Sequence, residues 1–264
     1  MVSTTRIVIL SNSGGAAKTT MATHLGYALG ASGKKVALLD FDPQGSLSLF
    51  TGLKRPQASE PTLANVLREE FDGNWNLHEV WAEQTQGRVE VCRSNTDLVK
   101  SSNELVLHER GAYVLADRLA DYPLPHDFLI FDCPATLGPL PLVALSAATH
   151  VLIVCQLEPK SLAALAALLT WIFEVIRRLR LNPAPTILGV VPSQYDRRLA
   201  IHRRLNAELI PVTQQIGIKC FNPIRHSADF KNASAKGLPL HLFRPNHPAI
   251  QDLSQVVEFV KGVG

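Results

Sequence analysis

Residues 6–29 read RIVILSNSGGAAKTTMATHLGYAL and predict a strand, a turn of small residues and a helix in direct succession. The apolar run at 6–10 is typical of a buried strand, and residues 19–29 have the spacing of a helix. Glycines in the turn let backbone N–H groups converge on phosphate oxygens, and the helix N-terminus adds positive potential. The stretch therefore predicts a cradle for nucleotide phosphates, in preference to an ordinary turn between a strand and a helix.

Side chains at the end of this turn supply the charge and the metal ligand that a nucleoside triphosphate needs. Lys18 is placed to neutralise the β- and γ-phosphates, and the Thr19 hydroxyl to ligate Mg²⁺. The turn departs from the common pattern G-x-x-x-x-G-K-[ST], because Asn12 and Ala17 stand where that pattern has glycines. The residues expected to contact the nucleotide here are Ser13, Gly14, Gly15, Ala16, Ala17, Lys18, Thr19 and Thr20.

The rest of the chain alternates strand-like and helix-like segments, the pattern of βα units that build a parallel sheet. Strands are expected at 6–10, 35–39, 89–92, 128–131, 151–155, 186–191 and 218–221. Helices are expected at 19–29, 61–69, 95–119, 140–147, 162–179, 199–216 and 249–260, and the irregular residues 72–83 are interpreted as a surface loop. The fold class is therefore α/β: one P-loop domain over residues 1–264, with a doubly wound, mostly parallel sheet and helices on both faces.

Composition excludes several classes of protein. Of the 264 residues, 46% are hydrophobic and 19% are charged, which argues against a disordered or coiled-coil chain. The four cysteines are scattered, so neither a zinc knuckle nor a redox dithiol is indicated. The N-terminus lacks the features of a secretory signal, and a cytoplasmic protein is expected. The apolar stretch 161–176 is interpreted as a helix packed on the sheet and not as a membrane span, because it contains Glu174 and is followed by Arg177 and Arg178.

Three aspartates follow predicted strands and are candidates for the chemistry. Asp40, Asp42 and Asp132 fall at the carboxyl ends of strands, where open α/β sheets bind their ligands. Transfer of a phosphoryl group is catalysed mostly by positioning and by charge neutralisation, so carboxylates near the phosphates are expected to hold Mg²⁺ and to orient water. For each of them, the alternative is a carboxylate that only caps a turn.

Four segments resemble the ParA/MinD family of ATPases, which have a deviant Walker A motif. Residues 13–19 match that family's loop K-G-G-x-x-K-[ST] except at its first position, and residues 38–45 (LLDFDPQG) resemble the segment after its second strand. Residues 131–135 (FDCPA) resemble the end of its Walker B strand, and residues 237–239 (GLP) match a landmark near its C-terminus. The resemblance spans nearly the whole chain and implies ATP and Mg²⁺ as ligands.

The resemblance also implies roles for individual residues. Asp42 would orient the attacking water, Asp132 would bind Mg²⁺ through water, and Asp40 would serve either role, beside Lys18 in the catalytic set. The preference for ATP over GTP rests on the resemblance alone. Residues expected near the adenine are Asn222, Pro223 and Pro245.

The family's signature lysine is replaced by Ser13 in this sequence, and a serine cannot supply the charge that this lysine brings to a partner's phosphates across a nucleotide-sandwich dimer. Either dimer-coupled hydrolysis is lost or another cation takes over. Lys160 follows the predicted strand 151–155 and is the candidate replacement, acting on the partner subunit's nucleotide; the alternative is a solvated residue at the start of a helix. The carboxysome-positioning McdA group resembles this sequence in both features.

The basic residues are concentrated in the last third of the chain. Residues 1–176 hold 13 Lys and Arg against 18 Asp and Glu, whereas residues 177–264 hold 13 against 5. A basic patch meets DNA phosphates without sequence preference, and the alternative is a solvated helix surface. The residues expected to bind DNA are Arg197, Arg198, Arg203, Arg204, Arg225 and Lys231. The final segment, 251–261, is not a basic amphipathic helix, so membrane targeting is disfavoured.

Together these features predict an ATPase that forms an ATP-dependent homodimer, binds nonspecific double-stranded DNA and associates with the nucleoid. It would position a cargo, with carboxysomes favoured, while an adaptor resembling McdB or ParB stimulates hydrolysis. The alternatives are a plasmid or chromosome partition protein and a nucleotide-gated DNA-binding module with negligible turnover. A metabolic or metal-cluster P-loop ATPase is disfavoured because the cysteines are not suitably paired.

Overall fold

The computed structural model describes residues 4–57 and 60–264, and a seven-stranded sheet forms its centre. Its strands are β1 (Thr5–Leu10), β2 (Val36–Asp40), β3 (Leu77–Glu79), β4 (Val89–Cys92), β5 (Phe128–Asp132), β6 (His150–Gln156) and β7 (Thr186–Ser193). The spatial order is β3-β4-β2-β5-β1-β6-β7, and the neighbours are parallel apart from the antiparallel pair β3 and β4. The predicted doubly wound, mostly parallel sheet is therefore confirmed.

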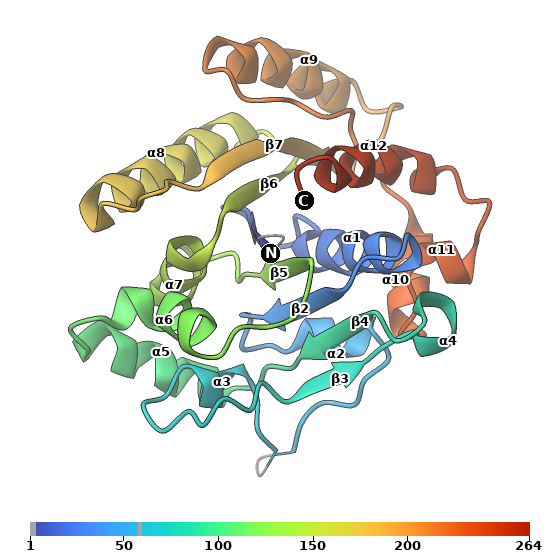
Figure 1. Ribbon diagram of the computed structural model, residues 1–264. Coiled ribbons are helices and arrows are strands. Elements are labelled where there is room, and N and C mark those ends of the chain that lie inside the picture. The colour runs from blue at the N-terminus through green and yellow to red at the C-terminus, as the bar shows by residue number, and fades with distance from the viewer. Residues whose placement is uncertain (1–3, 58–59) are drawn as a thin grey trace.

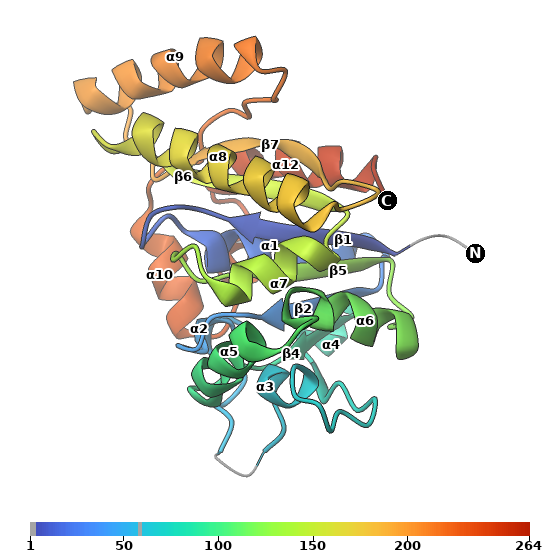
Figure 2. The same ribbon diagram turned by 90° about the vertical axis from the view of Figure 1, so that its left-hand side faces the viewer.

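Helices cover both faces of this sheet, because alternate residues of each central strand point to opposite sides. Val8 and Leu10 of β1 belong to the core that contains α7 (Pro139–Ala147) and α8 (Ser161–Leu179). Ile7 and Ile9 belong to the core that contains α1 (Lys18–Ala31) and α12 (Ala249–Lys261), and Figures 1 and 2 show the two helix pairs on opposite sides. Strands buried on both faces require continuous apolar sequence, which explains the uninterrupted runs of the central strands.

The apolar stretch 161–176 lies in α8, whose Leu165, Leu168 and Ile172 are buried against the sheet as predicted. None of the helices formed by residues 4–57 and 60–264 is long and apolar enough to cross a bilayer. The longer of the remaining helices, α9 (Ala200–Gln215), lies at the outer edge beyond β7 and is anchored by Leu205 and Leu209 (Figure 1). The others are α2 (Ser46–Phe50), α3 (Leu63–Val66), α4 (Ala82–Thr85), α5 (Asp97–Leu107), the 3₁₀ turn η1 (Gly111–Tyr113), α6 (Val114–Asp121), α10 (Ala228–Ala235) and α11 (Leu240–Phe243).

One loop prediction and one strand prediction were wrong. Residues 72–83, interpreted as a loop, contain the short edge strand β3, which pairs with β4 over three residues. Residues 218–221 do not form a strand, because they make only an isolated bridge between Cys220 and Val190 of β7. Pro223 follows this bridge and has no N–H to continue a ladder.

The predicted helix at 95–119 is divided into α5, η1 and α6. A Cβ atom at Gly111 would collide with the carbonyl oxygen of Leu105, so the chain can turn this tightly only at a glycine. The predicted helix at 61–69 shrinks to α3, which Thr62 and Asn65 cap at its N-terminus. The carbonyls after α3 are bound instead by the Arg118 guanidinium, which reaches the oxygen of Arg68 at 2.6 Å.

Candidate functional site

The small-residue turn between β1 and α1 lies at the carboxyl edge of the sheet, where β1 is flanked by β5 and β6. Gly15 and Ala17 adopt left-handed backbone conformations with φ of 76° and 72°, and α1 begins directly afterwards at Lys18. Among the described residues no side chain caps α1, so the N–H groups of its first turn remain available for an anion. Ala17 thus takes the conformation that the missing glycine would favour, at a cost of about 1 kcal/mol.

A cavity of about 360 Å³ opens beside this turn, with residues 14–21 along one wall. Lys18 lines it and is only 8% exposed. Burial lowers the pKa of Lys18, while the carboxylates of Asp132 and Asp42 act in the opposite direction. Their charges therefore support the ammonium form that a phosphate-binding lysine needs.

Asp132 ends β5 with both carboxylate oxygens fully buried and without a hydrogen-bond partner among the described residues. Burial raises the pKa of Asp132, whereas the Thr19 hydroxyl and the Lys18 ammonium lower it. A buried carboxylate is costly unless a cation or a donor satisfies it. The pair of Asp132 and Thr19 therefore fits a hydrated Mg²⁺ at this place.

Asp40 ends β2 and is the register partner of Asp132 across the β2–β5 pair. Its two carboxylate oxygens accept backbone N–H groups of Asp42 at 3.0 Å and of Leu47 at 3.2 Å. Burial, followed by the charge of Asp132, raises the pKa of Asp40 well above its usual value. Asp42 is half-buried and lines the cavity, so Asp42 has the access to a ligand and Asp40 holds the loop that carries it.

Ser13 and Lys160 line a second, smaller cavity of about 200 Å³ on the other side of the phosphate loop. The hydroxyls of Ser13 and Ser11 lie 3.3 Å apart. Lys160 is exposed at the start of α8 and makes no ion pair within the described part of the chain. Ser13 and Lys160, of which the second is predicted to replace the charge missing at the first, therefore line the same cavity.

The wall of the 360 Å³ cavity does not contain the residues predicted to lie near the adenine. Asn222, Pro223 and Pro245 are not among the residues that line it. Asn222 instead exchanges hydrogen bonds with Gln255 of α12, at 2.9 and 3.0 Å. This wall consists of Phe50, Ser193, Gln194, Ile224, Arg225, His226, Ser227, Phe230, Lys231 and Leu253.

Ser193 and Gln194 were missed by the sequence analysis. The Ser193 hydroxyl donates to the carbonyl of Ala16 at 2.8 Å, and the Gln194 amide donates to the carbonyl of Gly15. Their position at the carboxyl end of a parallel strand was the available signal, because ligands of such sheets bind at that edge.

The predicted DNA-binding residues fall into two groups. Arg197, Arg198, Arg203 and Arg204 occupy the β7–α9 connection and the first turns of α9, which we call the arginine turn. Arg225 and Lys231 line the nucleotide-sized cavity instead, and Arg225 is paired with Asp252 of α12 at 2.5 Å. All six lie in the basic last third of the sequence, and only the fold separates them into two groups.

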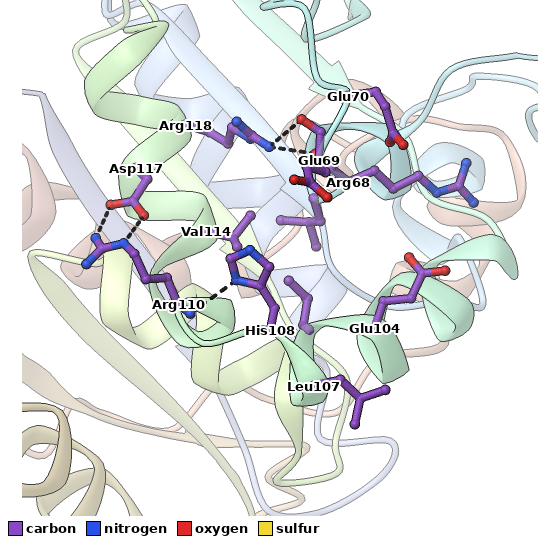
Figure 3. Close-up of a pocket in the computed structure, with 12 residues that line it drawn as sticks. Arg68, Glu69, Glu70, Glu104, Leu107, His108, Arg110, Val114, Asp117 and Arg118 are labelled. Atoms are coloured by element: carbon purple, nitrogen blue, oxygen red, sulfur yellow. Dashed lines mark hydrogen bonds and ion pairs between the residues drawn. The ribbon is translucent and has the colours of Figure 1, made fainter.

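A third cavity, of about 840 Å³, is larger than these two and lies elsewhere, between α3, α5 and α6 (Figure 3). Its lining includes the buried side chains of Leu67, Leu105 and Val114. Several of its polar groups bind one another, and Arg110 pairs with Asp117 at 2.7 Å (Figure 3). No residue of the phosphate loop lines it. Size alone therefore does not identify the nucleotide site.

A buried histidine joins the phosphate-binding helix to the C-terminal part of the chain. His24 of α1 accepts the backbone N–H of Leu240 on Nε2 at 2.9 Å, so its proton resides on Nδ1, which donates to the carbonyl of Thr20 at 2.6 Å. Burial lowers the pKa of His24 to about 3, and the nearby His241 adds to this effect. His24 is therefore neutral in the folded protein at physiological pH.

The free energy of unfolding is expected to depend on this histidine in acid. The unfolded chain takes up a proton below pH 6.5 and folded His24 only near 3, so the stability from neutral His24 is present above pH 6.5 and declines as the pH falls. Between pH 7 and pH 5 the wild type should lose about 2 kcal/mol more than His24→Gln in urea unfolding. His108→Gln, at an exposed position, is the control and should behave as the wild type does. Equal losses in all three proteins would contradict the assignment.

Comparison with known proteins places the chain in a family. A family model described as an AAA domain matches residues 4–184. The chain is 32% identical over 237 residues to the chromosome-partitioning ATPase Soj of Treponema pallidum, covering 89% of this chain and 88% of Soj. It is 32% identical over 242 residues to the chromosome partitioning protein ParA of Caulobacter vibrioides, covering 90% and 86%.

A solved structure has the same fold. A variant of McdA from Cyanothece in complex with ATP superposes with a TM-score of 0.85 and covers 98% of this chain and 96% of McdA, at 24% sequence identity. Together with the phosphate loop and its carboxylates, these matches show that the chain belongs to the ParA/MinD family of P-loop ATPases.

Proposed function

We propose that this protein is a Mg²⁺-dependent ATPase that dimerises around ATP, binds nonspecific DNA as the ATP-bound dimer and so positions a cargo on the nucleoid. The observation that carries the proposal is the cavity in which Lys18 and Asp42 meet an open phosphate loop, next to the buried Asp132 carboxylate, which has no hydrogen-bond partner in the described part of the chain. The family relationship supports hydrolysis of a nucleotide at this place.

Each residue of the cavity has a task in the proposed hydrolysis. Lys18 neutralises the phosphates, and Thr19 with Asp132 holds Mg²⁺, which supplies charge neutralisation on the transferred phosphoryl group. Asp42 orients the attacking water, and Asp40 fixes the Asp42 loop through the 3.0 Å hydrogen bond to its N–H. The base and sugar extend along the wall of the cavity that contains Ile224 and Phe230.

Lys160 is proposed to act in trans on the nucleotide of a second subunit. An exposed ammonium group with no ion-pair partner among the described residues, in one cavity with Ser13, can take over the charge that the loop itself lacks. Its exposure at the start of α8 leaves it free to reach a partner.

Carboxysomes are the proposed cargo, because Ser13 and Lys160 occur together and the McdA structure shares the fold. The stimulating partner would then be an adaptor of the McdB type. A plasmid or chromosome partition protein with a ParB-type partner is the second candidate, favoured by the 32% identity to Soj and to ParA. A nucleotide-gated module with negligible turnover is the third, motivated by Ser13.

Release of phosphate from ATP tests the enzymatic part of the proposal. Turnover is expected with Mg²⁺, is expected to stop when EDTA removes it, and is expected to rise with DNA and the adaptor. Turnover that persists in EDTA would contradict the proposed Mg²⁺ role. The absence of turnover under every condition would favour the nucleotide-gated module.

Neutralising the arginine turn is expected to weaken DNA binding without affecting ATP binding. Removing two phosphate contacts with Arg197→Ala and Arg204→Ala should lower DNA affinity about tenfold or more and reduce the slope of log affinity against log salt by about 2. Fluorescence anisotropy with a labelled duplex, ATP and Mg²⁺ measures both quantities.

The matched control removes two exposed arginines outside the arginine turn, Arg177 and Arg178 in the last turn of α8. This variant loses the same net charge and should retain nearly the affinity of the wild type. Equal losses in the two double variants would show that net charge, and not the arginine turn, governs binding.

A further inference from the structure

The phosphate loop is hydrogen-bonded to the connection that leads into α9. The Ser193 hydroxyl, on a residue only 2% exposed, donates to the carbonyl of Ala16 at 2.8 Å. The next residue, Gln194, donates its side-chain amide to the carbonyl of Gly15. Two consecutive peptide units of the loop are thus held by two consecutive residues at the end of β7.

The same connection is built as a rigid segment. Gln194 has a left-handed φ of 55°, and the following Tyr195 pairs with the backbone of Ile224 at 3.0 Å. The backbone N–H of Asp196 donates to Nδ1 of His202 in the first turn of α9, at 2.9 Å. The orientation of α9 is therefore tied to the strand end that holds the phosphate loop.

The arginine turn is part of this rigid segment. The Asp196 carboxylate accepts the Arg198 guanidinium at 2.7 Å and the Arg198 backbone N–H at 2.9 Å. The Arg203 guanidinium donates to the backbone carbonyl of Arg197 at 2.7 Å. These hydrogen bonds thus fix the positions of the Arg198 and Arg203 side chains relative to the backbone of the connection.

We propose that Ser193 and Gln194 are positioning residues that couple occupation of the phosphate loop to the orientation of the arginine turn. The N–H groups of the loop reorient toward a bound phosphate, and the carbonyls of the same peptide units move with them because peptide units are planar. Movement of the Gly15 and Ala16 carbonyls is passed to Ser193 and Gln194, and through the rigid connection to α9. This coupling rests on the proposed function and explains how nucleotide binding controls DNA binding.

Coupling between two binding sites is reciprocal, and this gives a test. If an ATP analogue raises the affinity for DNA by some factor, DNA must raise the affinity for the analogue by the same factor, typically about 5- to 150-fold. In the double variant Ser193→Ala, Gln194→Met, both factors should fall together toward 1. DNA affinity without nucleotide should remain close to that of the wild type, since the arginines are intact.

Two controls separate coupling from a general loss of structure. Gln194→Met alone retains the buried serine and is expected to show a partial loss of both factors. Gln214→Met, at an exposed position near the end of α9, makes the same chemical change away from the loop and should retain full coupling. A double variant whose two coupling factors equal those of the wild type overturns the proposal.

Hydrogen–deuterium exchange gives a readout that does not need DNA. Addition of AMPPNP and Mg²⁺ should change amide exchange across residues 194–203 of the wild type, and the change should disappear in the double variant. If the wild type fails to bind DNA but shows this response, the proposed function fails and the coupling stands. A wild type whose residues 194–203 do not respond to AMPPNP, or variants that respond as the wild type does, would refute the coupling.

Discussion

Replacing Lys18 with alanine is expected to reduce ATP hydrolysis by about 100-fold or more. Lys18 is the phosphate-loop residue that brings a positive charge to the cavity, and this residue is only 8% exposed. Charge that develops on phosphate oxygens in such a water-poor place is stabilised far more strongly than in water. Steady-state phosphate release at saturating ATP and Mg²⁺ measures the loss.

Two further variants make the Lys18 prediction specific. Lys18→Arg retains the charge, but its guanidinium group is larger and planar and does not fit the place of the compact ammonium group. This variant is therefore expected to recover little activity. Lys54→Ala removes an exposed lysine outside the cavity and should hydrolyse ATP at the wild-type rate. Hydrolysis by Lys18→Ala within a few-fold of the wild type would place the chemistry elsewhere.

Replacing Lys160 with alanine is expected to abolish ATP-dependent dimerisation at micromolar concentration. In a symmetric dimer each lysine contacts the nucleotide of the other subunit, so the variant loses two charge-assisted hydrogen bonds. At about 1.5–3 kcal/mol each, their loss raises the dimer dissociation constant by about 100-fold or more. Sedimentation velocity with AMPPNP and Mg²⁺ reports this change.

The cavity shared by Ser13 and Lys160 provides a rescue experiment. Introducing Ser13→Lys into the Lys160→Ala variant returns a cation to the position where the family carries its signature lysine, and partial recovery of dimerisation is expected. Lys100→Ala, on the exposed surface of α5, is the control and should dimerise normally. Unchanged dimerisation of Lys160→Ala would refute the trans-acting role.

The central strands could be predicted because parallel strands buried on both faces have an uninterrupted apolar sequence. β4 begins and ends at the predicted residues, β1 and β5 each gain one residue at one end, and β2 is shifted by one residue along the chain. The edge strand β3 could not be predicted in this way, since its residues Leu77–Glu79 pair only on one side and are mixed in polarity. Short helices such as α10 and α11 were missed because a few residues carry no periodic signal.

The division of the arginines shows a second limit of sequence reasoning. Arg197 and Arg225 are both basic residues of the last third, but Arg225 is folded back against the cavity by Asp252. The residues predicted near the adenine are affected in a related way: Asn222 is held by Gln255 and does not line the cavity, whose wall begins at Ile224. In both places a contact between α12 and the segment after α9 decides which side chains face the ligand.

The sequence by itself determined the α/β class and the strand–turn–helix order at the turn between β1 and α1, and it predicted the lysine, threonine and aspartates of the site. These features depend on local order along the chain: a strand, then a turn, then a helix, with carboxylates at the ends of strands. The tertiary structure alone decided that Asp40 positions the loop while Asp42 reaches the cavity, and that Ser193 and Gln194 hold Gly15 and Ala16. For Ser193 and Gln194 the physical reason is that their hydrogen bonds join residues almost 180 apart in the chain. Such contacts depend on which strands are neighbours, and short-range sequence patterns do not specify this.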